Sequence, residues 1–396
     1  MNTTPHAASA GAIPTENELV MRARAMIPML REGADAVEKA RRVPDSTVTA
    51  YKEAGFFKIL QPKRWGGWEM DPRVFSKVLM ELGRGCPSSA WVMMILGLHQ
   101  WEFGLFSPRA GDDVWAKDNT VLVASSYPPV GKYEKVDGGW KVSGRWPTSS
   151  GTDHADWAII GGWETNAQGG RTDRLNMLVP RSDYTIDDDW HVFGLCGTGS
   201  KSLVIKEAFV PDHRVHSMVS HQPSDPAPCY KPHFTLMFFG GVASAINGMA
   251  QGAVDIFTEQ MSVRRNTISG AVTSASPYVK DRLANAVAKV RSSRMRLLAV
   301  LGAAMEYAQR GEPVPLDEHV PALLDIARVG RECEEAVLLL YKATAARGIY
   351  LNNPLQRVLR DVLAGANHAT QNADDLAGHL GGYLLGQPLP PLVYNR

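Results

Sequence analysis

The spacing of apolar residues changes twice along this 396-residue chain. From about residue 16 to 117, and again from about residue 234 onward, apolar residues recur at the three-to-four-residue period of α-helices. Between these regions, residues 120–232 form short runs separated by Gly, Asn and Asp, which is typical of β-strands. The order therefore predicts a helical region, a β region and a second helical region.

This order favours an α+β, mostly α fold. We expect an N-terminal helical domain at residues 1–118, a central β-barrel or sandwich at 119–232 and a C-terminal four-helix bundle at 233–396. A turn around Gly138, between two strand-like runs, predicts a β-hairpin. Residues 238–261 are rich in Gly, Ala and Ser, which allows close helix packing and indicates a buried helix.

The charge balance and the cysteines exclude several classes of protein. Lys and Arg number 42 and Asp and Glu 41, so nothing favours binding to nucleic acid or to an anionic membrane. The longest apolar stretch, residues 91–98, is too short to cross a bilayer, and residues 1–18 do not resemble a signal peptide. The four cysteines lie far apart, so we expect no metal site, and reduced thiols in a cytoplasmic protein.

A hydroxyl-rich segment follows a predicted strand at residues 140–157. Trp146 precedes Thr148, Ser149 and Ser150, so an aromatic ring and three hydroxyls come close together. Such a segment suits a flat ligand with a polar edge, because the ring can cover a face while the hydroxyls bind the edge. An exposed Thr/Ser loop after an edge strand is the alternative that spacing alone leaves open.

His99 lies on an apolar helix that we expect at residues 87–106. Trp91 and Ile95 precede it at i−8 and i−4, so the three side chains form one stripe. A histidine in such a stripe is either a core residue or a functional base. The glycine-rich residues 194–200 lack the spacing of a dinucleotide fingerprint and precede a strand, which excludes that motif.

Three other polar segments are candidates. Ser125 and Ser126 end the first predicted strand, Arg264 and Arg265 follow a long helix, and residues 367–372 follow the final helix that we expect. Taken singly, each has an ordinary alternative: a turn, a solvated helix end and a C-terminal cap.

Together these segments resemble one family. The chain is similar over essentially its whole length to the acyl-CoA dehydrogenase fold, and more closely to the oxygenase components of two-component flavin-dependent monooxygenases. That group includes the 4-hydroxyphenylacetate 3-hydroxylase oxygenases and the phenol hydroxylase that acts on a secoandrostatriene-dione. The resemblance lies in SSGTDHADW at 149–157, GLCGTGS at 194–200, WGG at 65–67, HQW at 99–101 and SSY at 125–127.

The resemblance implies a function as well as a fold. A separate flavin reductase supplies FMNH2, with FADH2 as the alternative, and O2 adds to it to give a C4a-hydroperoxyflavin. This species then hydroxylates a small aromatic substrate, which we expect to be a phenol. The resemblance also implies a homotetramer.

The same resemblance implies roles for the candidate residues. Ser150 lies near the flavin N5, and His99 and His368 lie near the substrate hydroxyl. Ser125 is a nearby polar contact, with Ser126 as the alternative. Arg265 reaches the flavin phosphates across a subunit interface, with Arg264 as the alternative. The flavin-binding residues implied are Ser126, Trp146, Thr148, Ser149, Ser150 and Arg265.

Two other functions remain as alternatives. Acyl-CoA dehydrogenases typically carry a catalytic Glu in a Tyr-Glu-Gly-Thr run, whereas residues 367–375 have no such run and contain His368. This difference favours the monooxygenase over a dehydrogenase-like protein. A flavin oxygenase of the same fold that acts on an indole, an amine or a sulfur centre is the other alternative.

Overall fold

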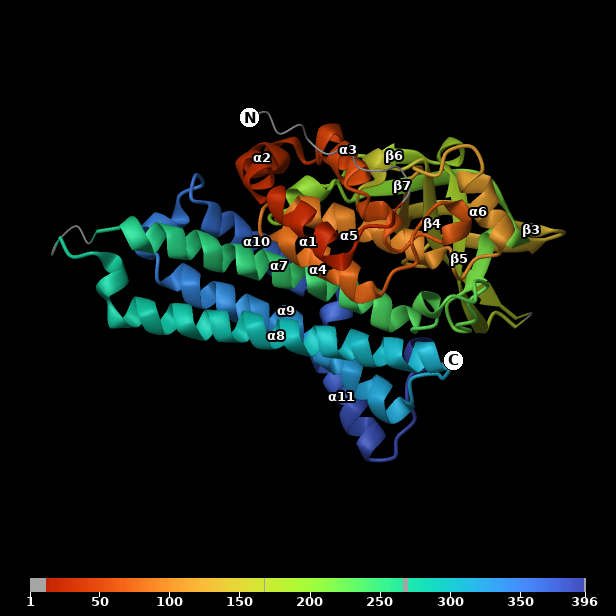
Figure 1. The fold of residues 1–396 in the computed structure, drawn as a ribbon. Helices are drawn as coiled ribbons and strands as arrows, with labels where there is room; N and C mark the ends of the chain where they lie inside the picture. The colour runs from red at the N-terminus through yellow and green to blue at the C-terminus, as the bar shows by residue number, and fades with distance from the viewer. Residues whose placement is uncertain (1–11, 167, 266–269, 395–396) are drawn as a thin grey trace.

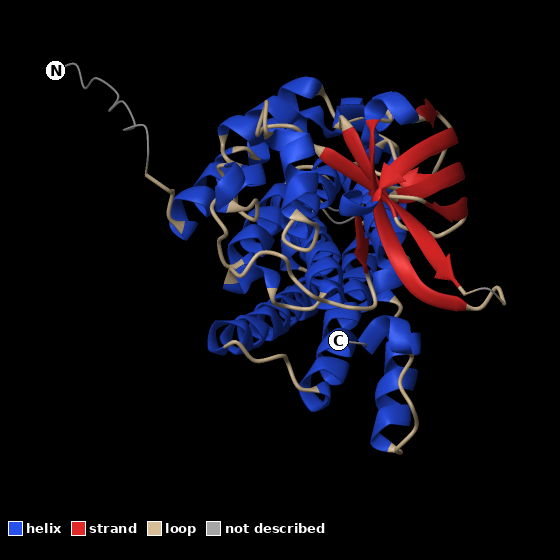
Figure 2. Ribbon diagram, turned by 90° about the vertical axis from the view of Figure 1, so that its right-hand side faces the viewer, coloured by secondary structure: helices blue, strands red, loops and turns tan. Residues whose placement is uncertain are grey.

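The computed structural model describes residues 12–166, 168–265 and 270–394. The strands are grouped at one end of the molecule, and the long helices α7 (Phe234–Val263), α8 (Pro277–Arg310) and α9 (Leu316–Lys342) extend away from them toward the other end (Figures 1 and 2). The chain begins with helices α1 (Glu16–Ala25), α2 (Ile27–Ala40), α3 (Asp45–Glu53), α4 (Pro72–Gly83), α5 (Pro87–Glu102) and α6 (Pro108–Trp115).

The β region is a sandwich of two four-stranded sheets. One sheet has the order β1-β4-β5-β8 and the other β2-β3-β7-β6. All strand pairs are antiparallel except β1 and β4, which are parallel. The strands are β1 (Val123–Ser126), β2 (Lys132–Val136), β3 (Gly139–Ser149), β4 (Trp157–Thr165), β5 (Arg171–Pro180), β6 (Thr185–Asp187), β7 (Lys201–Pro211) and β8 (Val215–Ser217).

The C-terminal helices complete the fold. They are α7 (Phe234–Val263), α8 (Pro277–Arg310), α9 (Leu316–Lys342), α10 (Pro354–Ala366), α11 (Ala373–Leu384) and α12 (Pro391–Tyr394). Because α11 and α12 follow, the helix that ends at Ala366 is not the final one. Residues 367–372 therefore connect α10 to α11, so the alternative of a C-terminal cap is wrong.

The two helical regions share one hydrophobic core. Helix α4 crosses α7 so closely that a Cβ on Gly248 would lie 2.6 Å from the Met80 carbonyl oxygen. Only glycine permits this approach without moving the backbone. The small residues of α7 thus bring the N-terminal and C-terminal helices together.

The apolar helix α5 lies where the three regions meet. It contacts α7 on one side and β1 and the 3-10 turn η5 (Cys196–Thr198) on the other. Pro87 stands in its first turn, where a missing N–H costs nothing, and the helix ends at Glu102, four residues before the expected end. No helix in the described ranges is long and apolar enough to cross a membrane.

Candidate functional site

One face of α5 carries the predicted stripe. Ile95, between Trp91 and His99, is the one residue within α5 that keeps appreciable accessible surface. The three side chains are one turn apart on the same face, so the stripe has Trp91 at one end and His99 at the other. Ser150 and His368 both contact the Trp91 end of this stripe.

His99 is fully buried, and its ring orientation is fixed by one hydrogen bond. The Nδ1 atom donates to the Val123 carbonyl oxygen at 2.7 Å, since a carbonyl can only accept. The Nε2 atom is buried and has no hydrogen-bond partner among the described residues. Burial lowers the pKa of His99, with the charge of Glu102 acting in the opposite direction. The ring is therefore neutral, and Nε2 is a free hydrogen-bond acceptor.

Ser150 lies at the other end of the stripe. Its hydroxyl accepts a hydrogen bond from Trp91 Nε1 at 3.2 Å and lies 2.7 Å from the Ser200 hydroxyl. Gly151 follows with φ +69°, and a Cβ there would press against Val92 and Leu96 of α5. The end of β3 is thus held directly against the helix that carries His99.

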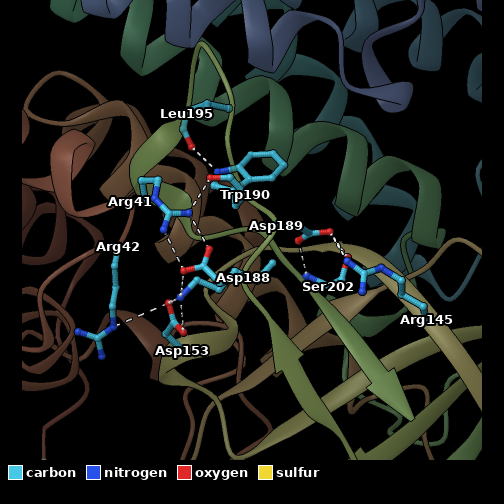
Figure 3. A network of polar contacts seen from close by, with 10 residues as sticks. Arg41, Arg42, Arg145, Asp153, Asp188, Asp189, Trp190, Leu195 and Ser202 are labelled. Atoms are coloured by element: carbon cyan, nitrogen blue, oxygen red, sulfur yellow. Dashed lines mark hydrogen bonds and ion pairs between the residues drawn. The ribbon is translucent and has the colours of Figure 1, made fainter. Parts of the chain in front are cut away.

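The two motifs at 149–157 and 194–200 form one structural unit. The Gly151 N–H donates to the Thr198 carbonyl at 3.0 Å, and Lys201 is paired with Asp153 at 2.9 Å. Figure 3 shows the polar network that continues from Asp153 and Asp188 to Arg41 at the end of α2. These contacts fix the hydroxyl-bearing turn relative to the N-terminal helices.

His368 lies on the connection between α10 and α11, with its ring centroid 5.6 Å from that of Trp91. Its Nδ1 accepts a hydrogen bond from the Thr370 N–H at 3.3 Å. Burial lowers the pKa of His368 to about 4, so the ring is neutral at pH 7. A neutral ring whose Nδ1 accepts carries its proton on Nε2. His368 therefore presents a donor where His99 presents an acceptor.

The other hydroxyls occupy different positions around the end of β3. Ser125 and Ser126 are buried at the end of β1, and the Ser126 hydroxyl donates to the Pro147 carbonyl. Ser149 is fully buried, and its hydroxyl has no partner among the described residues. Thr148 is exposed and has φ +60°, a left-handed conformation that is uncommon for a non-glycine residue.

Trp146 does not lie with these residues, which corrects the expectation that its ring covers a ligand. The ring is fully buried in the core of the sandwich, and its Nε1 donates to the Gly161 carbonyl at 2.9 Å. No face of the ring is accessible. The register of β3 shifts between Trp146 and Ser149, so the alternation of sides is broken there.

Arg264 and Arg265 follow α7 at the end of the molecule remote from the strands (Figure 1). Arg264 donates to the Thr344 carbonyl at 2.9 Å, whereas Arg265 is exposed and donates to the Gly270 carbonyl. Both line a surface pocket of about 780 Å³. Within one chain this pocket is far from Ser150.

The residues near Ser150 fit the edge of a flavin. The Ser149 hydroxyl is buried and unpartnered among the described residues, which is costly unless a ligand satisfies it. The left-handed backbone at Thr148 turns the chain beside it. Hydroxyls and backbone groups of this kind suit the polar edge of an isoalloxazine.

Sequence reasoning missed a buried polar group next to His99. Glu102 is fully buried and is hydrogen bonded to Tyr127, Asn176 and His216. Its position three residues after His99 on one helix was an available signal. Its partners on β5 and β8 could not be read from the chain order.

Comparisons with known proteins identify the family of the chain. Residues 15–104 and 241–373 match the family models for the acyl-CoA dehydrogenase N-terminal and C-terminal domains. The flavin-dependent monooxygenase oxygenase subunit HsaA of Rhodococcus jostii is 37% identical, over 90% of this chain and 95% of that protein. The oxygenase component of the FADH2-dependent resorcinol hydroxylase of a Rhizobium strain is 31% identical, over 98% of both chains.

Solved structures give the same result. The 3-HSA hydroxylase from Rhodococcus superposes with a TM-score of 0.91 at 35% identity, over 95% of this chain and 99% of that chain. XiaF from Streptomyces, solved with FADH2 and glycerol, gives 0.87 at 28% identity, over 96% and 98%. The relatives are oxygenases that depend on reduced flavin, and the three-part fold predicted for this chain is confirmed. The chain belongs to the oxygenase components of flavin-dependent monooxygenases, which have the acyl-CoA dehydrogenase fold.

Proposed function

We propose that this monooxygenase hydroxylates a phenol, and that His99 accepts the phenolic proton. The observation that carries the proposal is the buried Nε2 atom of His99, an acceptor without a partner among the described residues. A phenol O–H satisfies such an acceptor and gives up its proton to it, whereas a thioether brings no proton and the N–H of an indole or an amine is a far weaker acid. Relatives named as resorcinol and p-hydroxyphenylacetate hydroxylases support this substrate class.

The chemistry of His99 follows from its surroundings. A neutral imidazole that accepts the proton makes the ring of the substrate more electron-rich and so more reactive toward an electrophilic oxygen. Val123 holds the ring in the tautomer that leaves Nε2 unprotonated. When bound, the reduced flavin supplies the activation of O2.

The other site residues orient the reactants and exclude water. His368 offers an Nε2–H donor at the Trp91 end of the stripe. Ser125, which precedes Ser126 on β1, adds a buried hydroxyl. We propose that Ser150 holds a proton at the flavin N5, with Ser149, Thr148 and the Ser126 region beside it. Exclusion of water by this buried site slows the loss of activated oxygen as peroxide.

The cations near Ser150, Lys201 and Arg41, are already paired with Asp153 and Asp188, so the flavin phosphates need another cation. We propose that Arg265 of a second subunit provides it, because Arg265 is exposed at the far end of α7. This role requires at least one partner subunit, and we propose that the homotetramer expected from the sequence provides it. FMNH2 stays our prediction, although two relatives are described with FADH2. The four buried free thiols support a reducing compartment, and we propose the cytoplasm.

Rapid mixing tests the proposal. The protein with reduced FMN or FADH2 is mixed with O2 and with resorcinol, 4-hydroxyphenylacetate, indole or a sulfide. We expect an absorbance transient before oxidised flavin appears, and product formation with the phenols that is coupled to O2 use. Immediate flavin oxidation with stoichiometric peroxide for every phenol would contradict the proposal. Coupled oxidation of indole or the sulfide alone would favour a non-phenolic substrate.

A further inference from the structure

A carboxylate is completely buried one turn beyond His99. Glu102 has no exposed surface, yet three donors reach its two oxygens. Asn176 donates to Oε1 at 2.6 Å and His216 Nε2 lies 2.8 Å from the same oxygen, while the Tyr127 hydroxyl donates to Oε2 at 2.5 Å. Burial alone would raise the pKa of Glu102, but the hydrogen bond and charge of His216 bring the pKa below its usual value. The carboxylate is therefore ionised.

Tyr127 links this carboxylate to His99. Its hydroxyl is held by Glu102, and its ring lies edge-on to the His99 ring, with centroids 5.9 Å apart. Phe238 contacts both rings, at 5.4 Å from Tyr127 and 6.0 Å from His99. The ring beside His99 is thus fixed through a hydrogen bond to a buried negative charge.

His216 faces the Glu102 carboxylate from a nearly buried position on β8. Its Nδ1 lies 3.0 Å from the Ser217 carbonyl oxygen and its Nε2 faces Glu102, so both ring nitrogens face acceptors. Only an imidazolium can donate to both. His216 also lines a surface pocket of about 180 Å³, with Leu105, Ser217, Ser220 and Gln222.

We propose that Glu102 is a positioning residue for hydroxylation: its carboxylate fixes Tyr127 against His99 and places a negative charge that strengthens His99 as a base. The inference rests on the proposed role of His99. It extends that role, because burial by itself makes an imidazole a weaker base. A nearby carboxylate offsets this loss without touching the substrate.

Other charges around these groups are few in the described part of the chain. Glu102 is faced by His99 on its own helix, by His216 on β8 and by the amide of Asn176 on β5. Tyr127 is faced by Arg174 of β5, which donates to the Tyr127 carbonyl at 3.3 Å. Among the charged side chains of the described residues, Glu102 is the one that acts on the pKa of His99, and its negative charge raises that pKa.

Two substitutions with opposite expected signs test this role. Glu102→Gln keeps the shape but removes the negative charge, and His216→Gln keeps a donor to Glu102 but removes the positive charge. The pH dependence of resorcinol hydroxylation rises as His99 loses its proton. We expect this rise to move to lower pH in Glu102→Gln, by at least about half a unit, with a plateau rate lowered about tenfold as part of the general-base contribution. In His216→Gln, where Asn176 and Tyr127 still donate to Glu102 and keep it ionised, the rise moves to higher pH.

A readout without substrate accompanies the kinetics. The histidines of the purified protein are labelled at ¹³Cε1, and their NMR signals are followed as the pH is changed. The His99 signal is assigned by its absence in His99→Gln. The His99 midpoint should fall in Glu102→Gln and rise in His216→Gln. Because His216→Gln alters a pocket-lining residue, it keeps the inference testable if Glu102→Gln does not fold.

Two control variants separate charge from packing. Tyr127→Phe keeps the ring and the carboxylate, so the rate should fall while the pH midpoint stays in place. Asp113 on α6 is paired with His213 at 2.7 Å, so Asp113→Asn breaks another carboxylate–imidazole pair. This variant should leave the pH midpoint of His99 unchanged. Unmoved midpoints in both Glu102→Gln and His216→Gln would overturn the inference. A wild-type profile that persists in His99→Gln would instead overturn the proposed function.

Discussion

The hydroxyl groups of Ser150 and Ser200 lie 2.7 Å apart, although the residues are 50 positions apart in the chain. Ser200 in turn lies 2.7 Å from the Thr198 hydroxyl, which donates to the Leu195 carbonyl. The Ser150 hydroxyl therefore belongs to a chain of hydroxyls, with Trp91 Nε1 as an added donor. This arrangement fixes the orientation of Ser150 before any ligand binds.

Replacing Ser150 should uncouple oxygen use from hydroxylation. Ser150→Ala removes the hydroxyl that we place at the flavin N5, so peroxide release should rise at least about fivefold, the equivalent of one hydrogen bond of about 1 kcal/mol. Substrate binding should be unchanged. The measurement is the ratio of product to O2 consumed, with peroxide measured directly.

Ser202→Ala is a matched control for this variant. Ser202 is buried as well, but its hydroxyl donates to Asp189, which is also paired with Arg145 (Figure 3). Its loss should affect stability and leave coupling intact. Equal coupling in Ser150→Ala and wild type would remove Ser150 from the N5 role.

Replacing His99 should abolish the basic step while leaving flavin binding intact. In His99→Gln no imidazole accepts the phenolic proton, so hydroxylation should fall by roughly 10²-fold, at the lower end of the range for general-base catalysis. The pH dependence should flatten, and a substrate that binds as the phenolate should be hydroxylated with less loss. The rate of product formation after rapid mixing, followed from pH 5 to 9, checks this. A hydroxylation rate in His99→Gln within twofold of wild type would exclude His99 as the general base.

His368 should act differently from His99. Its pKa is lowered to about 4 by burial, so it stays neutral across the working pH range. His368→Ala should therefore lower hydroxylation without changing the shape of the profile between pH 6 and 9. A profile that loses its rise in this variant would mean that His368, and not His99, takes the proton.

The sequence allowed some of this site to be predicted because helical spacing is local. Trp91, Ile95 and His99 share one face for any straight helix, so their stripe could be expected from their positions. The orientation of Trp146 could not, because a register shift after it breaks the two-residue alternation of β3. Glu102 was missed for another reason: its partner His216 is 114 residues away and is brought to it by the pairing of β5 with β8.

Asp361 should make the stability of the protein depend on pH. It is buried on α10, where its carboxylate accepts a hydrogen bond from the Leu195 N–H at 2.6 Å, in the same loop as Thr198. Burial raises the pKa of Asp361 to about 7. The folded state therefore holds this proton in a range where the unfolded state has lost it, since an ordinary Asp titrates near 3.9.

The sign follows from proton binding. Between about pH 4 and 7 the folded state binds more protons at this site, so the contribution of Asp361 to stability falls as pH rises and levels off above pH 7. About three pKa units correspond to a loss of about 4 kcal/mol, an upper figure for this group alone. Asp361→Asn keeps an acceptor for Leu195 and removes the titration. We expect the variant to be more stable than wild type at pH 8, with the difference reduced or reversed at pH 5, measured by urea unfolding. An equal difference at both pH values would show that Asp361 is ionised in the folded protein with an ordinary pKa.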